Sequence, residues 1–189
     1  MVGHTTERPV ETRSINGVRV VGPIAAWIGL CGLVGIDDLV AAGDRLIGLP
    51  YRLAAIEEID AAVLAHAWRR GARDLRAARG LIRADVYSPR ETRLRLLVTR
   101  AGYREPEPNG RIRLANGRVF RGDLVFRAER VLLEYEGDHH RTDATQWARD
   151  LDRYNSLAAA GWIVVRLSGR MSDREVLAAV GRAFEAARA

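Results

Sequence analysis

The fold of this chain is decided by the segment Arg118-Val-Phe-Arg-Gly-Asp-Leu-Val-Phe-Arg127 and by the one that follows it, Val131-Leu-Leu-Glu-Tyr-Glu-Gly-Asp-His-His140. Both contain apolar runs of strand length, and Ala128–Arg130 between them is expected to form a turn. The acidic residues Asp123, Glu134 and Glu136 interrupt these runs. Because side chains alternate along a strand, Glu134 and Glu136 share one face, which Asp123 can reach if the two strands are neighbours.

Carboxylates gathered between apolar strands predict a metal site. The three negative charges repel one another, and burying a charge without compensation costs several kcal/mol or more. A hard divalent cation that prefers oxygen ligands is the usual compensation. We therefore expect Asp123, Glu134 and Glu136 to bind Mg²⁺ or Mn²⁺.

The composition is that of an ordinary globular protein with a basic second half. At 189 residues, 48% of them hydrophobic and 29% charged, the chain is long enough for one or two small domains. All 30 basic residues are arginine, and the net charge is +1 over residues 1–85 and +5 over residues 86–189. Acidic points within a basic surface suit a site that holds both a metal and a nucleic-acid backbone. DNA is therefore the expected partner, although a need for solubility explains the charge equally well.

The sequence does not favour export or membrane insertion. Cys31 is the only cysteine, which excludes an intrachain disulfide and indicates a reducing compartment. The apolar run Pro23–Ile36 is shorter than the ~20 residues that a membrane-spanning helix needs, and no small-residue cleavage site follows it. We expect a cytoplasmic protein that is not attached to a membrane.

The first part of the chain predicts a mostly helical region over residues 14–85, after a loose N-terminal stretch over residues 1–13. Asn16-Gly17 is typical of a hairpin turn. Helices are expected over about 23–32, 37–46, 53–68 and 72–83, the second of them capped by Asp37 or Asp38. Nothing here predicts catalysis, and His66, on an apolar stripe, is expected to be at least partly buried.

Residues 86–189 predict a separate α/β domain. Ser88-Pro89-Arg90-Glu91 is a capping-box pattern that opens a helix ending near Gly102, with Glu91 on its inward side. The capping box alone would account for a glutamate at this position. After a turn at Pro106 and Pro108, the expected elements are strands 111–114, 118–127 and 130–137, a helix over 143–160, a strand over 162–167 and a helix over 172–188. This αβββαβα order gives a mixed sheet with helices on its faces.

The helix predicted over 143–160 combines apolar and basic residues. Its expected inward, core-forming face consists of Trp147, Leu151, Tyr154 and Ala158. Arg149 and Arg153 on this helix, with Arg141 just before it, could neutralise backbone phosphates. Arg153 could instead pair with Asp150, about one turn earlier. The strand over 162–167 is mostly apolar, as in strands buried inside a sheet.

Several motifs occur together in residues 86–189. They are Ser88-Pro89-x-Glu91-Thr92-x-Leu94, Gly122-Asp123, Glu134-Tyr135-Glu136-Gly137-x-x-His140, Asp150, Arg153 and Gly161-Trp162-x-Val164-x-Arg166. As a set they resemble the PD-(D/E)XK nuclease superfamily, in particular an uncharacterised bacterial domain related to very-short-patch-repair endonucleases. The resemblance implies a restriction-endonuclease-like fold and metal-dependent hydrolysis of DNA.

The resemblance also implies roles for single residues. Asp123 and Glu134 would be metal-binding carboxylates, and Glu91 would act from the first helix on the metal or its water. The family usually has Asp where this chain has Glu136, and the lysine common in the wider fold is absent. Because arginine stays protonated, it cannot replace that lysine as a base. Glu136, or His140, which matches the family histidine, is therefore expected to take the proton from the attacking water.

Residues 14–83 resemble a helical connector found in longer members of that family. There the connector lies between an abortive-infection-antitoxin-like winged helix and the nuclease domain. No winged helix is evident in this sequence, which on that basis looks like a shortened member or like the product of a gene whose start was placed too late.

Three functions follow from these observations. The first is a Mg²⁺-dependent DNA endonuclease or nickase, a hydrolase that acts on phosphodiester bonds. The second is a DNA-binding or regulatory protein, of a toxin–antitoxin or defence system, that keeps the nuclease fold with little activity. The third is a structural domain in which the carboxylates form ordinary ion pairs with arginines.

Overall fold

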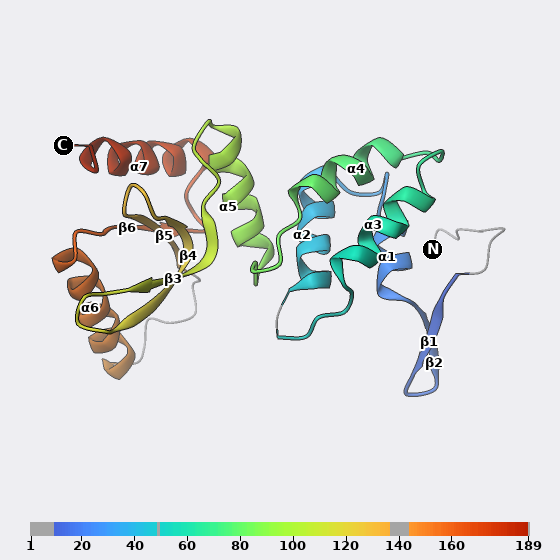
Figure 1. Ribbon diagram of the computed structural model, residues 1–189, viewed down its shortest axis with the longest axis horizontal. Coiled ribbons are helices and arrows are strands. Elements are labelled where there is room, and N and C mark those ends of the chain that lie inside the picture. Colours follow the sequence, from blue (N-terminus) through green and yellow to red (C-terminus); the bar gives the residue numbers. More distant parts are fainter. Residues whose placement is uncertain (1–9, 49, 137–143, 189) are drawn as a thin grey trace. The chain divides into compact units, whose positions relative to one another are not determined.

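The computed structural model describes residues 10–48, 50–136 and 144–188, with the side chains of 144–148 excluded. The chain divides into two compact units at Pro89/Arg90, which are described here separately (Figure 1). The class is mixed α/β: the described residues form seven helices, a four-stranded mixed sheet and a two-stranded antiparallel sheet. None of the described helices combines the length and apolar character that crossing a membrane requires.

The first unit opens with the predicted hairpin. Strands β1 (Thr12–Ile15) and β2 (Val18–Val21) pair in antiparallel fashion. The turn residues Asn16 and Gly17 have φ angles of 50° and 79°, in the left-handed region that a tight two-residue hairpin requires. The Asn16-Gly17 prediction is therefore confirmed.

Four helices complete the first unit: α1 (Pro23–Gly29), α2 (Ile36–Ile47), α3 (Ile56–Ala65) and α4 (Ala72–Leu81). The buried Trp27 indole of α1 donates a 2.8 Å hydrogen bond to the carbonyl of Leu39 in α2. The N-cap of α2 is Gly35, so the prediction that Asp37 or Asp38 caps this helix is wrong. Both aspartates lie in its first turn, where negative charge favours the helix dipole without capping. His66 is half-buried, as predicted.

The second unit has the predicted order of elements. They are α5 (Pro89–Arg100), β3 (Glu107–Arg113), β4 (Val119–Phe126), β5 (Val131–Glu136), α6 (Ala144–Ala159), β6 (Ile163–Ser168) and α7 (Asp173–Ala186). The sheet order is β3-β4-β5-β6, with two antiparallel pairs followed by a parallel β5–β6 pair across the α6 crossover. The turn between β4 and β5 lies at the predicted position, and Arg130 has a φ of 53° there.

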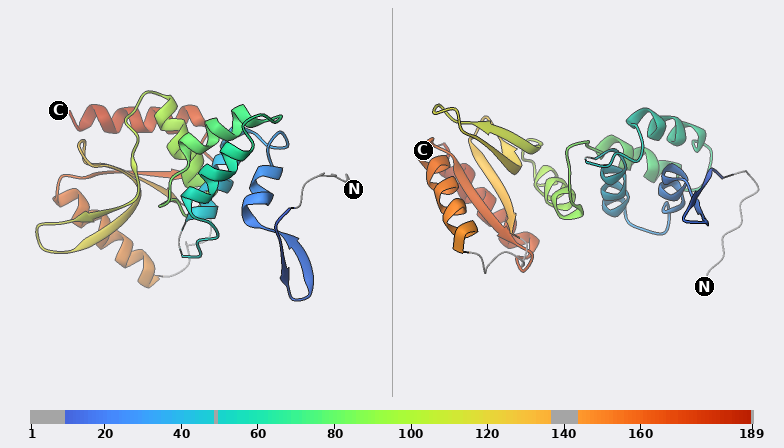
Figure 2. Two further views of the ribbon diagram at one scale, coloured as in Figure 1. Left: turned by 45° about the vertical axis from the view of Figure 1, so that its right-hand side comes forward. Right: turned by 90° about the horizontal axis from the view of Figure 1, so that it is seen from below.

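Helices cover both faces of this sheet (Figure 2). On one face, side chains of β4, β5 and β6 pack with α5 and α7 in a cluster that includes Leu94, Leu124, Leu133 and Val180. On the other face, Val125 and Leu132 pack with Leu157 of α6. The unit is therefore a three-layer arrangement in which β5, at the centre, is buried on both faces.

Three details of this unit differ from the sequence predictions. Pro108 lies within β3 and not in a turn, because β3 is an edge strand, where a missing N–H is tolerated. Strand β6, whose apolar sequence predicted a strand inside the sheet, is also at an edge. Its side chains are mostly apolar because helices cover both faces of the sheet. The inward face of α6 is shifted, so that Leu157 is buried while Leu151 is 46% exposed. The inner face of α6 includes a half-buried Arg153, whose partner is described next.

Candidate active site

The β4–β5 ladder ends at the predicted carboxylates. Its last pair is Leu124↔Leu133, so the next position in register places Asp123 opposite Glu134. Beyond this point β4 continues with β3 as its partner. The Oδ2 atom of Asp123 accepts a 2.7 Å hydrogen bond from the backbone N–H of Tyr135. The Asp123 carboxylate thus receives a β5 backbone donor at the place where the two strands part.

The alternation of faces along β4 is interrupted beside Asp123. A Cβ atom at Gly122 would lie 2.0 Å from Cδ1 of Leu132, which packs on the α6 side of the sheet. Val125 packs on that same side of the sheet. In a regular strand, residues three positions apart, such as Gly122 and Val125, would face opposite sides, so the strand is irregular between them. Irregularities of this kind re-aim a side chain and are common beside active sites.

Strand β3 has a matching irregularity at Asn109. Both neighbours of Asn109 pair with β4, but Asn109 itself, opposite Asp123, is left out of the ladder. Its φ of 50° lies in the left-handed region, which asparagine tolerates better than most residues. Its Nδ2 atom donates a 2.6 Å hydrogen bond to Oε2 of Glu91. The distortion of β3 therefore brings an amide donor to the glutamate of α5.

Glu91 is the third acid at this end of the sheet. It lies in the first turn of α5, is only 8% exposed, and so occupies the predicted inward position. Burial raises the pKa of Asp123; the Tyr135 N–H opposes this rise, and the negative charge of Glu91 adds to it. The Glu91 carboxylate of α5 is therefore near enough to Asp123 of β4 to disfavour its charged form.

Glu134 is buried beside an arginine of α6. It is 8% exposed and forms an ion pair with Nη2 of Arg153, which also donates a 2.5 Å hydrogen bond to the carbonyl oxygen of Arg121. Burial raises the pKa of Glu134 to about 7; Arg153 lowers it, while the charges of Asp123 and Glu136 raise it. One guanidinium therefore does not compensate the negative charge gathered at this site.

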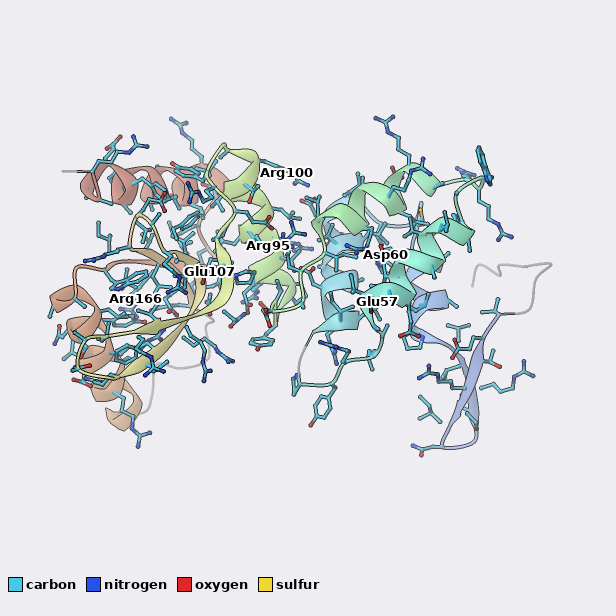
Figure 3. All side chains as sticks on the ribbon, in the orientation of Figure 1. Glu57, Asp60, Arg95, Arg100, Glu107 and Arg166 are labelled. Carbon is cyan, nitrogen blue, oxygen red and sulfur yellow. The ribbon has the colours of Figure 1, made fainter. Side chains whose placement is uncertain are left out.

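Glu136 has a separate arginine partner. It forms an ion pair with Arg166 of β6, which is labelled in Figure 3 and whose Cα pairs in the parallel ladder with that of Glu134. The ring of Tyr154 on α6 lies near both guanidinium groups, with its centroid 5.8 Å from Cζ of Arg153 and 4.9 Å from Cζ of Arg166. The pKa of Tyr154 is raised by burial and then by the charge of Glu134. Tyr154 thus lies beside the acids and is not only a core residue.

The acids suit a hard cation in chemistry but are not gathered around one point. Their oxygen donors are those that Mg²⁺ and Mn²⁺ take, and the pKa values of Asp123 and Glu134 are raised chiefly because burial disfavours the charged carboxylate. Within residues 10–48, 50–136 and 144–188, however, no three acidic, histidine or cysteine side chains come close enough together to hold a metal ion. Glu134 and Glu136 are instead directed to arginines.

The remaining predicted site residues are distributed as follows. His140 and Arg141 lie outside the described residues. Arg149 is exposed on α6. Arg153 pairs with Glu134 across the α6–sheet interface, an arrangement that neither its predicted phosphate contact nor its alternative pairing with Asp150 anticipated.

Sequence reasoning also missed residues that the structure brings to the site. Arg166 belonged to the family-like motif but received no role, although its place in an apolar strand marked it as unusual. Asn109 follows a proline and precedes a glycine, a sequence that favours a turn. In the structure this tolerance of positive φ serves a strand irregularity instead, so the signal was present in the sequence but was not used.

The pH dependence of stability should report the state of Glu134. Its pKa is about 7 in the folded protein against 4.5 ordinarily, so the folded state binds the proton more tightly than the unfolded state. The resulting stabilisation is complete below the lower value and is lost as the pH rises through the upper one. We expect the metal-free protein to lose roughly 2–3 kcal/mol of unfolding free energy between about pH 5 and pH 8, measured by urea titration in the presence of a chelator.

Other acids do not obscure this pH window. The pKa of Glu107 is lowered, first by its hydrogen bond with Arg127, so its contribution is lost only at pH values below its ordinary range. Asp123 shifts in the same direction as Glu134 and adds to the effect. A constant unfolding free energy between about pH 5 and pH 8 would show that Glu134 ionises normally.

Comparison with known proteins adds no assignment, because no protein-family model, no curated protein and no solved structure matches the chain. The resemblance to PD-(D/E)XK nucleases is thus neither supported nor opposed by a relative.

Proposed function

We propose that residues 90–189 form a metal-dependent DNA endonuclease or nickase with a restriction-endonuclease-like αβββαβα fold. The observation that carries this proposal is the position of Asp123 and Glu134 where β4 and β5 part. Asp123 is adjacent to the last β4–β5 pair, Leu124↔Leu133, and its carboxylate accepts a hydrogen bond from the N–H of Tyr135, the residue after Glu134. The negative charge of Glu91 on α5 adds to the rise in the pKa of Asp123. Acids from three separate elements thus lie at this end of the sheet, although among the described residues they are not gathered around one point.

Each residue of the site has a distinct role in this proposal. Asp123 and Glu134 would hold Mg²⁺ or Mn²⁺, and Asn109 fixes the Glu91 carboxylate beside them through its amide. When bound, such an ion acts as a Lewis acid on a phosphoryl oxygen and lowers the pKa of water. Glu136 would accept the proton from the attacking water, and the exposed Arg149 is available to backbone phosphates.

A metal titration on DNA tests this function. Purified protein is incubated with supercoiled and linear DNA over a range of Mg²⁺ and Mn²⁺ concentrations, in parallel with Asp123→Ala. We expect nicked or linear products that require the metal and disappear in the variant, because Asp123 is a ligand. Asp152→Asn, which removes an acid of an exposed ion pair with Arg118, is the matched control and should cleave like the wild type. Cleavage that persists in Asp123→Ala or in a chelator would contradict the proposal.

One observation favours a second function, DNA binding without cleavage. Glu134 and Glu136 are both paired with arginines, whose positive charge can offset the negative charge of the carboxylates without a metal ion. This function predicts salt-dependent DNA binding, because arginine–phosphate contacts release counterions, with no product at any metal concentration. The same incubation followed by an electrophoretic mobility assay separates the two functions.

A further inference from the structure

A fully exposed tryptophan lies in the first unit, between the end of α3 and the start of α4 (Figure 1). The side chain of Trp68 is 99% exposed, whereas Trp27 in the same unit is 1% exposed and belongs to the core. Because burial of so large an aromatic side chain stabilises a protein, the exposed position of Trp68 contributes nothing to the fold. A single exposed apolar residue is common, and what distinguishes Trp68 is its surroundings.

Exposed arginines follow Trp68 in the sequence, and with it they form a region, residues 66–76, that we call the Trp68 corner. They are Arg69, Arg70, Arg73 and Arg76. The chain contains no acid between Asp60, which pairs with Arg79 (Asp60 is labelled in Figure 3), and the half-buried Asp74. Among the described residues, no acid forms an ion pair with Arg69, Arg70 or Arg73. These three charges are therefore available to an anionic partner.

Hydrogen bonds order the Trp68 corner on both sides of the tryptophan. The imidazole of His66 donates from Nε2 to the carbonyl oxygen of Arg70 at 3.0 Å. Nη1 of Arg76 donates to the carbonyl oxygen of Ala67 at 3.5 Å, so this guanidinium reaches back from α4 to the residue before Trp68. The indole is thus presented by an ordered turn, which reduces the entropy that a ligand must overcome on binding.

An exposed aromatic ring among arginines without acidic partners is the combination that binds single-stranded nucleic acid. Bases stack on the ring, and the guanidinium groups neutralise the phosphates on either side. In a duplex the bases are already stacked on one another, so a ring on the protein surface does not reach their faces, whereas those of a single strand are free. A membrane-binding segment would need a broad apolar face, but two arginines follow Trp68 directly.

We propose that the Trp68 corner binds a single strand of nucleic acid, with the indole stacked on an unpaired base and Arg69, Arg70 and Arg73 on the flanking phosphates. Neither kind of contact reads a base edge or the 2′-hydroxyl, so the site accepts any base sequence in DNA or RNA. The site belongs to the first unit alone, needs no metal ion and is independent of the nuclease proposed for residues 90–189.

Strand binding by the full chain tests the role of the ring. The affinity for a fluorescein-labelled oligothymidylate of about 15 nucleotides is measured by anisotropy in a chelator, at about 50 mM salt. Trp68→Ala and Trp68→Leu should each weaken binding about 5–100-fold, because stacking is lost, while Trp68→Phe keeps a ring and should stay within about threefold of the wild type. Leu64→Ala, at a 77% exposed apolar residue of α3, is the matched control and should bind like the wild type.

The salt dependence of the same binding tests the arginines. Each phosphate contact with a single strand contributes about 0.7 to the slope of log affinity against log salt concentration, so the double variant Arg69→Gln with Arg70→Gln should make this slope shallower by about 1.4. Arg19→Gln, at an exposed arginine of the β1–β2 hairpin, is the control and should keep the wild-type slope. An unchanged slope in the double variant would overturn the phosphate contacts.

Other ligands give outcomes that would contradict the assignment. A duplex of the same length should be insensitive to Trp68→Ala, and an equal loss of duplex binding would refute the preference for a single strand. An RNA strand of the same length should bind within about threefold of DNA, and a preference above about tenfold would show that the contacts are different ones. If Trp68→Ala instead abolishes binding to phosphatidylglycerol vesicles and leaves strand affinity unchanged, the corner is a membrane contact and the proposal is wrong.

The result does not depend on folding defects or on the nuclease. Every substituted side chain is exposed, so the variants should melt at the wild-type temperature, which is measured in parallel. The chelator prevents metal-dependent cleavage, so strand binding is measured whether or not the second unit is an enzyme. Full strand affinity in Trp68→Ala or Trp68→Leu, or no strand binding by the wild type, would overturn the proposal.

Discussion

Glu134→Gln is expected to abolish metal-dependent cleavage while making the metal-free protein more stable. Glutamine keeps an oxygen that can accept from Arg153 but removes the charge that a cation needs. Because the site raises the pKa of Glu134 to about 7, it favours an uncharged group at this position. We expect cleavage to fall at least about a hundredfold and the unfolding free energy at pH 8 to rise by roughly 1–3 kcal/mol, or about 5–15 °C in melting temperature. Cleavage assays and thermal melts in a chelator measure the two effects.

The opposite signs distinguish a functional acid from a structural one. Asp152→Asn, at an exposed ion pair, should leave cleavage and melting temperature close to those of the wild type. Glu134→Gln should also flatten the fall in stability with pH, because the titrating group is gone. If Glu134→Gln melts below the wild type at pH 8, Glu134 supports the fold as an ordinary ion-pair partner and the metal hypothesis loses its main residue.

Gly122→Ala is expected to destabilise the second unit strongly. The φ of Gly122 is not in the left-handed region, so alanine is allowed by the backbone and the limit is space. A Cβ atom would lie 2.0 Å from Cδ1 of Leu132, which is completely buried at the centre of the sheet and cannot move aside easily. We expect a loss of about 2–3 kcal/mol, measured by urea unfolding, together with reduced cleavage because Asp123 is the next residue.

Two further variants show whether the contact itself is responsible. Gly181→Ala in α7 is the matched control, since its Cβ would meet only Tyr103 Oη at an ordinary 3.5 Å. It should stabilise the protein by about 0.5–1 kcal/mol through helix propensity. In the double variant Gly122→Ala with Leu132→Ala, the clash is absent, so the combined loss should be smaller than the sum of the two single losses. If the losses of unfolding free energy in the two single variants simply add, the contact with Leu132 is not the cause of the destabilisation by Gly122→Ala.

The order of elements in the second unit could be predicted because each element carries its own local signal. The Ser88-Pro89 start gave the beginning of α5, and the apolar runs on either side of the 128–130 turn gave β4 and β5. Once these strands are antiparallel neighbours, a short turn leaves little freedom in register. The position of Asp123 next to the last β4–β5 pair, Leu124↔Leu133, follows from the same local information.

The partners of the acids could not be predicted, because they depend on contacts between distant segments. Arg153 lies on the inner face of α6, where it forms an ion pair with Glu134 of the sheet. The periodicity of the sequence placed Leu151 on the inner face instead, but Leu151 is exposed. Similarly, the segment at Pro106 and Pro108 was assigned to a turn, and Asn109 after it received no role. Its role depends on Glu91, which belongs to a different element. The local sequence pattern indicates on which face of its own helix or strand a residue lies. It does not indicate which charged residue of another element will contact it.

The irregular course of β3 has a consequence for association between copies of the chain. An edge strand with a continuous row of free backbone groups invites a strand from another molecule, and this is a common route to aggregation. In β3, Pro108 removes one N–H, and the positive φ of Asn109 breaks the straight row of donors and acceptors. The exposed cations Arg111 and Arg113 repel a second β3 approaching side by side. The irregularity of β3 that brings Asn109 to Glu91 therefore also hinders this edge of the sheet from pairing with a strand of another molecule.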